Sequence, residues 1–433
     1  MPRVNQSEMY VSLDIGSSSI KVLIGEMSDD SLHVIGVGNV KSNGIRKGTI
    51  VDIDATVQSI KKAVGEAERM IGMSIHEIVL GIPANLANIQ NVKGVVAVNR
   101  EDREITDADL DRVLESAQVM SIPPERELIN IAPKQFIVDH LEEIKDPRGM
   151  IGTRLELDGL MMTTSKTILH NVLRCVERAG LQIREIYLQP LAAGHFALTE
   201  DEKNHGTAYI DIGGGSTTIA IFREGHLVNT AVIPVGGDHI TKDLSIVLKT
   251  PTEQAEMIKL KYGHAFYDDA SDDELFEVPV IGADMKEQYS QRYIAEIIGV
   301  RLEELFELIL EEFYRMGLQD LPGGVVITGG VAKLEGIGQL ARHILQSRVR
   351  LYTPDYIGVR EPQYTTAVGL IRYAYKEDLF YGKIGNSHAL SQMAHNEVVA
   401  STKKQKQPQK NSNNENKESA MSKAKKLFDK FFE

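Results

Sequence analysis

The stretch "YIDIGGGSTTIAIF", from Tyr209 to Phe222, places an aspartate, three glycines and three hydroxyl residues between two apolar runs. Nearly the same phrase, "YVSLDIGSSSIKVLIGE", occurs from Tyr10 to Glu26. Aligned on their aspartates, the phrases match without a gap at a separation of 197 residues. Each has the pattern of a β-hairpin, with an apolar strand, a tight turn of small residues and a second strand of alternating polarity. One repeat at this distance indicates a duplicated domain with two lobes, rather than a solenoid.

The composition is typical of a soluble globular protein. Of 433 residues, 42% are hydrophobic and 25% are charged, which allows two or three domains with cores of their own. The net charge of −13 argues against a general nucleic-acid binder. The lone cysteine, Cys175, excludes an intramolecular disulfide and fits a reducing cytosol. No signal-peptide pattern and no run of 18 apolar residues occurs, so we expect neither secretion nor a membrane-spanning helix.

The two turns have the composition of phosphate-binding loops. Small residues let the backbone approach a ligand, and successive backbone N–H groups form a concave site for anions. An aspartate at each strand end can orient a water of Mg²⁺, which usually keeps several waters when substrate phosphates hold it. Two facing hairpins would hold a triphosphate from both sides. The alternative is a pair of merely structural hairpins, but one copy in each half favours a ligand.

A third glycine-rich phrase, "GGVVITGGVAKLEG", starts at Gly323. Its strand pattern ends in Gly329 and Gly330, where the backbone can approach a flat ligand such as a purine. By itself the phrase fits a structural strand end equally well. The chain lacks a G-x-x-x-x-G-K-[ST] loop and a G-x-G-x-x-G after a strand, and its histidines are scattered. We therefore expect neither a P-loop, nor a Rossmann site, nor a transition-metal centre.

The phrase "TPTEQAEMIK" predicts the start of a helix. Thr250 is expected as the N-cap, Pro251 at the first helical position and Glu253 as the partner in a capping box. Glu256 and Lys259 lie three residues apart and share a face of this helix. They would either contact an adenosine or form an ordinary surface ion pair.

Two segments depart from the repeated pattern. Residues 83–164 are more charged and are interpreted as an inserted subdomain with a small core. Residues 401–419, "STKKQKQPQKNSNNENKES", contain no aliphatic, aromatic, Met or Cys residue. Such a segment cannot bury enough surface to offset its ordering entropy, so we expect a flexible tether.

The final phrase, "AMSKAKKLFDKFFE", repeats apolar residues at the i, i+3, i+4, i+7 spacing of an amphipathic helix. A helix of this length extends about 21 Å, too short to span a bilayer but suited to lie in its interface. From Thr402 onward the chain carries nine lysines and four acidic residues. The alternative is packing against the protein's own body or a partner, which the polar tether disfavours. The residues expected at the membrane are Lys423, Lys425, Lys426, Leu427, Phe428, Lys430, Phe431 and Phe432.

Together these phrases resemble the signature of the actin, sugar kinase and DnaK-type ATPase superfamily. Its motifs occur in order over roughly residues 10–375. They are a phosphate hairpin (14–24), a connecting helix (187–194, "YLQPLAAG"), a second phosphate hairpin (211–221), an adenosine strand-turn (325–330, "VVITGG") and a second connecting helix (365–370, "TTAVGL"). Within the superfamily the chain closely resembles the FtsA family of bacterial cell-division proteins.

The resemblance implies an α/β fold, an actin-like ATPase of two duplicated lobes with an inserted subdomain in the first lobe, a disordered linker and a C-terminal amphipathic helix. The expected parts are a first lobe core (1–82 with 165–196 and 366–385), the insert (83–164), a second lobe core (197–240 with 300–365), a small second-lobe subdomain (241–299), the linker (386–419) and the tail helix (420–433).

The resemblance also implies ATP with Mg²⁺ in a cleft between the lobes. By this resemblance, Asp14 and Asp211 would lie near the metal and contact it through water. The residues expected near the phosphates are Gly16, Ser17, Ser18, Lys21, Gly213, Gly214, Gly215 and Ser216. Those expected near the nucleoside are Glu256, Lys259, Gly329 and Gly330. Gln189 occupies the place of a water-orienting glutamine and, with Asp211, would act in catalysis. Thr218 stands where the superfamily can carry a histidine that positions the attacking water. We therefore expect at most a slow ATPase, with ATP acting mainly as a structural ligand.

The implied function is an ATP-bound scaffold that forms filaments on anionic lipids at the cytoplasmic face of the membrane, at the division septum. It would anchor the tubulin-like FtsZ by the FtsZ C-terminal peptide and recruit later division proteins. Arg292 and Arg301 are candidate partners for that acidic peptide, or merely exposed helix arginines. The alternatives are a small-molecule kinase, a DnaK-type chaperone and a pilus-assembly scaffold. A kinase has no need of a membrane tail, and no β-rich substrate domain remains for a chaperone.

Overall fold

The computed structural model describes residues 7–381 except 29, 47, 86, 119–121, 283–285 and 319. The linker and tail helix expected at 386–433 lie outside these residues, as do all the residues expected at the membrane. The chain forms two compact units. Among the described residues, the first comprises residues 7–91, Ile122–Ala132 and Leu160–Glu377, and the second comprises Val92–Ser121, Pro133–Gly159 and residues 378–381.

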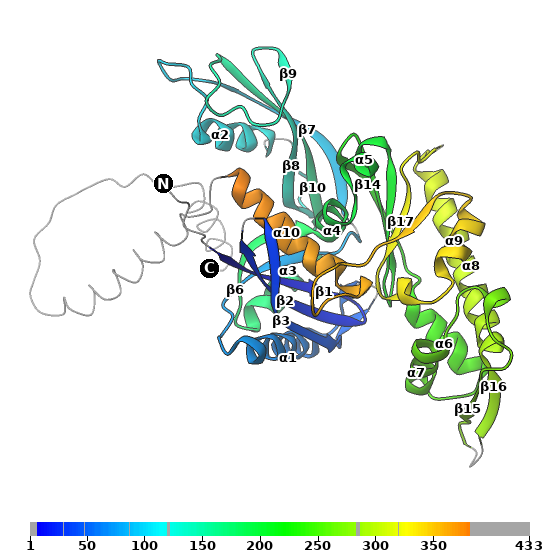
Figure 1. The fold of residues 1–433 in the computed structure, drawn as a ribbon. Coiled ribbons are helices and arrows are strands. Elements are labelled where there is room, and N and C mark those ends of the chain that lie inside the picture. Colours follow the sequence, from blue (N-terminus) through cyan, green and yellow to red (C-terminus); the bar gives the residue numbers. More distant parts are fainter. Residues whose placement is uncertain are drawn as a thin grey trace, which may run out of the picture. The chain divides into compact units, whose positions relative to one another are not determined.

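The first lobe is built on a mixed sheet with the strand order β11–β6–β1–β2–β3 (Figure 1). The strands are β1 (Glu8–Ile15), β2 (Ser19–Ser28), β3 (Ser31–Lys41), β6 (Glu77–Ile82) and β11 (Gln182–Leu188). Strand β1 pairs antiparallel with β2 and parallel with β6. Helices α1 (Ile53–Ile71) and α3 (Lys166–Arg178) share a hydrophobic core with the sheet. The short strands β4 (Ile45–Arg46) and β5 (Thr49–Ile50) join β3 to α1.

The second lobe repeats this plan with the strand order β14–β13–β12–β17–β18. Its strands are β12 (Thr207–Ile212), β13 (Thr217–Arg223), β14 (His226–Ile233), β17 (Gly324–Thr328) and β18 (Val349–Leu351). Strand β12 pairs antiparallel with β13 and parallel with β17. The helices of its core are α6 (Gly237–Val247), α7 (Thr252–Tyr262), α8 (Gln291–Arg315) and α9 (Ile337–Leu345), beside the hairpin of β15 (Leu275–Pro279) and β16 (Lys286–Ser290).

The two hairpins carry the same turn. The N–H of Gly16 donates to the carbonyl of Ser19 at 3.1 Å, and the N–H of Gly213 donates to the carbonyl of Ser216 at 3.0 Å. The strand beyond each hairpin also takes the same place, because β6 lies parallel to β1 and β17 lies parallel to β12. The predicted duplication is therefore confirmed in the backbone.

Alternation along β1 and β12 decides where their aspartates point. In β1, Val11, Leu13 and Ile15 enter the core with α1 and α3. In β12, Ala208 and Ile210 enter the core with α6 and α8. Because successive side chains point to opposite faces of a strand, the aspartate of each strand points away from its lobe's core.

Two helices cover those opposite faces, α4 (Gln189–Ala197) and α10 (Thr365–Phe380). Their backbones touch at Gly369, where a Cβ would lie 2.8 Å from the Cα of Ala193. The Tyr10 ring of β1 packs edge-on against Tyr375 of α10 at 6.0 Å between centroids. Helix α5 (Glu200–His205) follows α4 and opens with a capping box between Thr199 and Glu202. Gly369 thus permits the close approach of α10 to α4, whereas Gly194 of the first connecting phrase makes room for the ring of Phe222.

The second unit contains a sheet with the order β7–β10–β8–β9. Its elements are β7 (Asn88–Ala97), α2 (Asp107–Gln118), β8 (Arg126–Val138), β9 (Leu141–Ile144) and β10 (Arg154–Ser165). Helix α2 packs tightly on β7, since a Cβ on Gly94 would collide with the carbonyl of Val113. The ring of Phe380, at the end of α10, stacks on Phe136 at 6.3 Å.

Side-chain capping explains the starts of α1, α5 and α8, but the capping predicted for α7 was wrong. Helix α1 begins where the Asp52 carboxylate accepts from the N–H of Ala55 at 3.0 Å, as an N-cap should. Helix α7 begins at Thr252 with Pro251 as its cap, one residue later than expected. Thr250 does not cap it, because its hydroxyl donates to the carbonyl of Pro279 in β15 at 2.8 Å. This tertiary bond replaces the predicted capping box.

The part boundaries expected at 196/197, 240/241 and 299/300 fall inside α4, α6 and α8. These helices run without a break from one expected part into the next, so the partition stays a proposal. In the described part of the chain, no helix combines the length and apolar character needed to cross a membrane.

A half-buried histidine on α4 links the stability of the first unit to pH. The His195 ring contacts the rings of Phe222 at 5.7 Å and Tyr373 at 5.4 Å between centroids. Its Nδ1 is buried and has no hydrogen-bond partner among the described residues. Burial, helped by neighbouring positive charges, lowers the pKa of His195 to about 3. Those charges belong to Lys376, Lys203 and His226.

We expect His195→Gln to flatten the pH dependence of unfolding. Histidine in the unfolded chain titrates near pH 6.5, so only the unfolded state takes up this proton as the pH falls. The contribution of neutral His195 to the free energy of unfolding is therefore complete above about pH 6.5. Below that pH it declines by at most about 1.4 kcal/mol per pH unit. Urea unfolding of both proteins at pH values from about 7 to 4.5 measures the difference. If the free energy of unfolding changed with pH in the same way for both proteins, the prediction would be contradicted.

Candidate functional site

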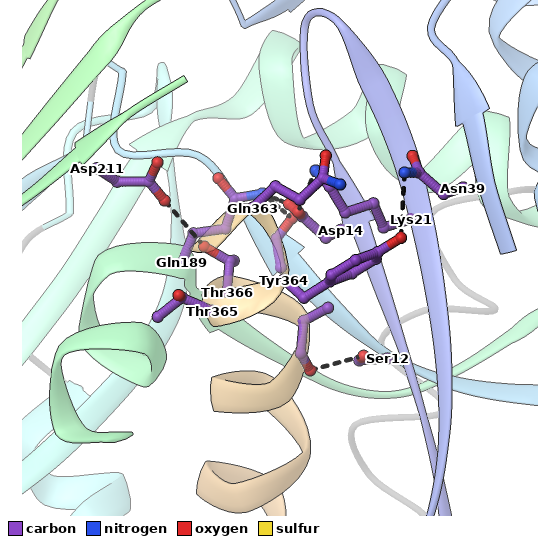
Figure 2. Close-up of polar contacts among 12 residues, drawn as sticks. Ser12, Asp14, Lys21, Asn39, Gln189, Asp211, Gln363, Tyr364, Thr365 and Thr366 are labelled. Atoms are coloured by element: carbon purple, nitrogen blue, oxygen red, sulfur yellow. Dashed lines mark hydrogen bonds and ion pairs between the residues drawn. The ribbon is translucent and has the colours of Figure 1, made fainter. Parts of the chain in front are cut away.

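The first turn holds a buried aspartate between a lysine and a glutamine (Figure 2). Asp14 and Lys21 are register partners on β1 and β2, only 6% and 8% exposed, and Lys21 Nζ lies 3.5 Å from Asp14 Oδ2. Gln189, the first residue of α4, donates from Nε2 to Asp14 Oδ1 at 2.8 Å. The same Nε2 lies 3.5 Å from the carbonyl of Gly81 in β6. Lys21 from β2 and Gln189 from α4 therefore fix this carboxylate together.

The second aspartate has a matching place at the end of β12. Thr366 of α10 donates from Oγ1 to Asp211 Oδ2 at 3.2 Å (Figure 2). Gly329 sits against the other oxygen, because a Cβ there would collide with Asp211 Oδ1. Burial and the negative charge of Asp14 raise the pKa of Asp211 to about 6, against the lowering effects of Lys21 and the Thr366 bond. The two aspartates of the two lobes are thus close enough for their charges to interact.

The two turns meet tip to tip. A Cβ on Gly214 would collide with Ser18 Oγ, and a Cβ on Gly215 would lie 2.7 Å from Ser17 Cβ. Glycine is required at these two positions by the close approach rather than by an unusual φ angle. The sequence prediction of facing hairpins is met by this contact.

A residue that the sequence reading missed joins the two turns. Ser18 Oγ donates to both carboxylate oxygens of Asp238, at 2.9 and 3.1 Å. Asp238 is in the first turn of α6, and its N–H donates to the carbonyl of Gly214 at 2.8 Å. Gly236, two residues before Asp238, also lies close to this turn, because a Cβ on it would be 2.5 Å from the carbonyl oxygen of Gly214. The available signal was the phrase "VGGDHI" at 235–240, small residues opening a helix.

Glu256 and Lys259 form an ion pair, with Lys259 Nζ 2.7 Å from Glu256 Oε2. The pair is not an ordinary surface one, since Lys259 is only 7% exposed. Its Nζ also donates to the carbonyl of Gly237 at 3.1 Å and to Thr241 Oγ1 at 2.8 Å. Lys259 is thereby held beneath the first turn of α6, beside the second hairpin turn. Contact with an adenosine stays a prediction.

The strand-end glycines differ from each other. Gly329 has a φ of +92°, a conformation that side chains with a Cβ rarely adopt. Gly330, which begins a 3-10 turn (Gly330–Lys333), would have nothing within 4 Å of an added Cβ. Gly329 is thus explained by its own backbone, whereas the space beside Gly330 is open.

Opposite charges are arranged at this place in a way that suits an anion and a cation together. Lys21 and Lys259 are buried cations, while Asp14 and Asp211 place carboxylate oxygens at the ends of β1 and β12. Among the described residues, no three His, Cys, Asp or Glu side chains gather as a metal site. Two carboxylates leave most of a Mg²⁺ coordination sphere to water and ligand oxygens. Hollows of about 200 Å³ near Arg184 and about 360 Å³ near Arg223 lie elsewhere and include no residue of the turns.

The arginines expected to bind a partner lie apart from the turns, on α8. Arg301 makes a two-pronged ion pair with Asp243, with Nε 2.6 Å from Oδ2, and also contacts Glu304. Arg292 pairs with Asp272 at 3.5 Å. Neither is a free cation, so a partner's carboxylates would have to share or replace these contacts.

Comparison with solved structures defines the class. A chain of a PilM–PilN type IV pilus biogenesis complex matches with a TM-score of 0.57 at 17% identity, covering 85% of this chain and 98% of that one. MreB5 of Spiroplasma citri bound to ADP matches with a TM-score of 0.54 at 14% identity, covering 87% and 99%. These likenesses concern the fold, and with the paired turns they define a protein of the actin-like class.

Sequence comparison defines the family. A profile described as "Cell division protein FtsA" matches residues 208–369, and one described as "SHS2 domain inserted in FTSA" matches residues 85–163. The cell division protein FtsA of Bacillus subtilis (strain 168) is 56% identical over 383 residues, 88% of this chain and 87% of that protein. The chain belongs to the FtsA family of cell division proteins.

Proposed function

We propose that this protein is an ATP-binding actin-like scaffold that polymerises on the cytoplasmic face of the cell membrane at the septum. There it would anchor the FtsZ ring through the FtsZ C-terminal peptide and help to recruit later division proteins. The observation that carries the nucleotide part is the meeting of two matching turns of small residues beside Asp14 and Asp211. Family membership supports cell division over the kinase and pilus-assembly alternatives.

The residues at the turns fit ATP with Mg²⁺. Glycines keep side chains out of the space nearest the backbone, Lys21 and Lys259 offset phosphate charge, and the two carboxylates would hold metal-bound waters. Bound Mg²⁺ would shield the phosphates and draw the two lobes toward one ligand. A cation between the carboxylates and the phosphates would offset the repulsion between these like charges.

Hydrolysis is proposed to be slow. Gln189 is held by Asp14 at 2.8 Å, so it would have to position the attacking water from that tethered place. Thr218, the register partner of Asp211 on β13, cannot act as an imidazole would. With weak general-base help, ATP would serve mainly as a conformational and polymerisation ligand.

The proposed FtsZ site is the outer surface of α6, α7 and α8. Exposed apolar side chains on these helices include Ile246, Met257 and Val300, which are 63%, 56% and 66% exposed. Since Arg301 is already paired with Asp243, apolar contacts would supply most of the affinity for the peptide. Arg301 and Arg292 would then mainly select an acidic sequence.

The membrane contact is assigned to residues 420–433. Burying Leu427 and the phenylalanines contributes about 1.5–3 kcal/mol each, and each lysine near an anionic surface about 1 kcal/mol. Ordering one helix at a surface offsets much of this gain, so a single copy binds reversibly. A filament that presents many copies binds far more tightly because the later contacts are intramolecular.

One experiment tests anchor and partner together. Anionic vesicles are sedimented with a labelled FtsZ C-terminal peptide and either the full chain or a chain ending at Ser419. We expect the full chain to carry the peptide into the pellet, and the shortened chain to pellet at least about tenfold less. A chain with residues 420–433 scrambled keeps the composition but loses the apolar face, and should behave like the shortened one.

Equal pelleting of the full and shortened chains would refute the anchor. If the full chain pellets while the labelled peptide stays in the supernatant, the partner assignment is refuted and the anchor is not.

A further inference from the structure

The first turns of α4 and α10 stand in the same relation to the two aspartates. Gln189, at the start of α4, donates to Asp14 at 2.8 Å, and Thr366, at the start of α10, donates to Asp211 at 3.2 Å (Figure 2). Asp14 and Asp211 are counterparts in the repeated hairpins. Thr366 is therefore the second-lobe counterpart of Gln189.

The neighbours of Thr366 fix its position. The adjacent hydroxyl of Thr365 lies 2.7 Å from Thr328 Oγ1 and donates to the carbonyl of Pro362 at 2.8 Å. In the same turn, the carbonyl of Ala367 accepts from the hydroxyl of Ser12 of β1 at 2.8 Å. The start of α10 is thus fastened to both lobes, to β17 by Thr365 and to β1 by Ala367.

The Asp211 side chain has little freedom once Thr366 is in place. The backbone of Gly329 packs against Oδ1, and the Thr366 hydroxyl holds Oδ2. Without the hydroxyl, the carboxylate would keep its charge but lose the contact that sets its orientation. A carboxylate that holds a metal through water depends on such orientation, because its oxygen must meet a water at a fixed octahedral position.

We propose that Thr366 is a positioning residue that orients Asp211 toward the waters of a Mg²⁺ bound to a nucleoside triphosphate. This role rests on the proposed nucleotide function. The residue that orients Asp211 would then belong to α10, the helix that contacts β1 of the first lobe.

The test compares Thr366→Val, which keeps the shape without the hydroxyl, with Thr366→Ser, which keeps the hydroxyl. Thr365→Val is the matched control, since it removes the neighbouring hydroxyl that faces Thr328 instead of Asp211. The affinity for a fluorescent ATP analogue is measured with excess Mg²⁺ and with EDTA, and melting temperatures are measured without nucleotide. We expect Thr366→Val to weaken binding in Mg²⁺ about tenfold, because it loses one charge-assisted hydrogen bond. Its affinity in EDTA should stay within about twofold of that of the unaltered protein. Thr366→Ser should restore the Mg²⁺ effect.

An equal loss in Mg²⁺ and EDTA, or the same Mg²⁺-specific loss in Thr365→Val, would overturn the positioning role. If Thr366→Val does not fold, Thr366→Ala is compared with Thr366→Ser by the same ratio of affinities. Absence of binding by the unaltered protein would instead overturn the proposed nucleotide function and this role with it, a result distinct from a loss confined to the variant.

Discussion

Replacing Gly329 by alanine is expected to cost about 2–4 kcal/mol of unfolding free energy and to weaken ATP binding by on the order of 100-fold. Its φ of +92° is strained for any residue with a Cβ. The added Cβ would also lie 2.5 Å from the carbonyl of Ile212 and collide with Asp211 Oδ1. Either β12 or the Asp211 carboxylate has to move, and both belong to the proposed metal site. Denaturant unfolding and titration with a fluorescent ATP analogue measure the two effects.

Gly330→Ala is the matched control, one residue further along the chain. An added Cβ there meets nothing within 4 Å, and its φ is not in the left-handed region. We expect the control to change stability by less than about 1 kcal/mol. Similar losses in both variants would show that the strand end, rather than contact with Asp211, determines the effect.

Cysteines placed at positions 18 and 238 are expected to form a disulfide that holds the two turns together. The side chains of Ser18 and Asp238 face each other in the unaltered protein, with their oxygens 2.9 and 3.1 Å apart. A disulfide at these positions requires the two Cβ atoms to come to about 3.8 Å. The native Cys175 is buried and does not compete. Release of a nucleotide bound before oxidation should slow at least about tenfold, because the turns can no longer separate. Stopped-flow displacement before and after a reductant measures this change.

A double variant at positions 18 and 243 is the control, since Asp243 lies on the same helix but pairs with Arg301. It should neither cross-link within the chain nor slow release. Fast release from the fully oxidised 18–238 protein would show that the ligand leaves without separation of the turns.

Much of the fold was predictable from local patterns. The repeated phrases predicted both hairpins and their common turn, which the backbone bonds of Gly16 and Gly213 confirm. The phrase from Thr250 predicted helix α7, although α7 begins at Thr252 rather than at the expected capping box. That error arose because Thr250 bonds to a strand 29 residues later, which no local rule includes. The charged block at 83–164 overlaps the match of the inserted domain at 85–163.

The site was predictable where its residues lie within one motif. Gly214, Gly215 and Lys21 were expected near the phosphates from the family resemblance. The structure places Gly214 and Gly215 at the meeting of the turns and Lys21 beside Asp14. Asp238 and Thr366 were missed, because each follows its own ordinary helix-start pattern and becomes notable only beside a hairpin from elsewhere in the chain.

The sequence by itself determined which backbone shapes are possible: small residues permit the tight turns, and alternation along β1 and β12 sends each aspartate away from its lobe's core. Only the tertiary structure decided what meets those aspartates. Their hydrogen-bond partners arrive on α4 and α10, and α6 brings Asp238 to Ser18 of the first turn. All of these are far away in the sequence, and long-range hydrogen bonding leaves no local pattern in a single chain.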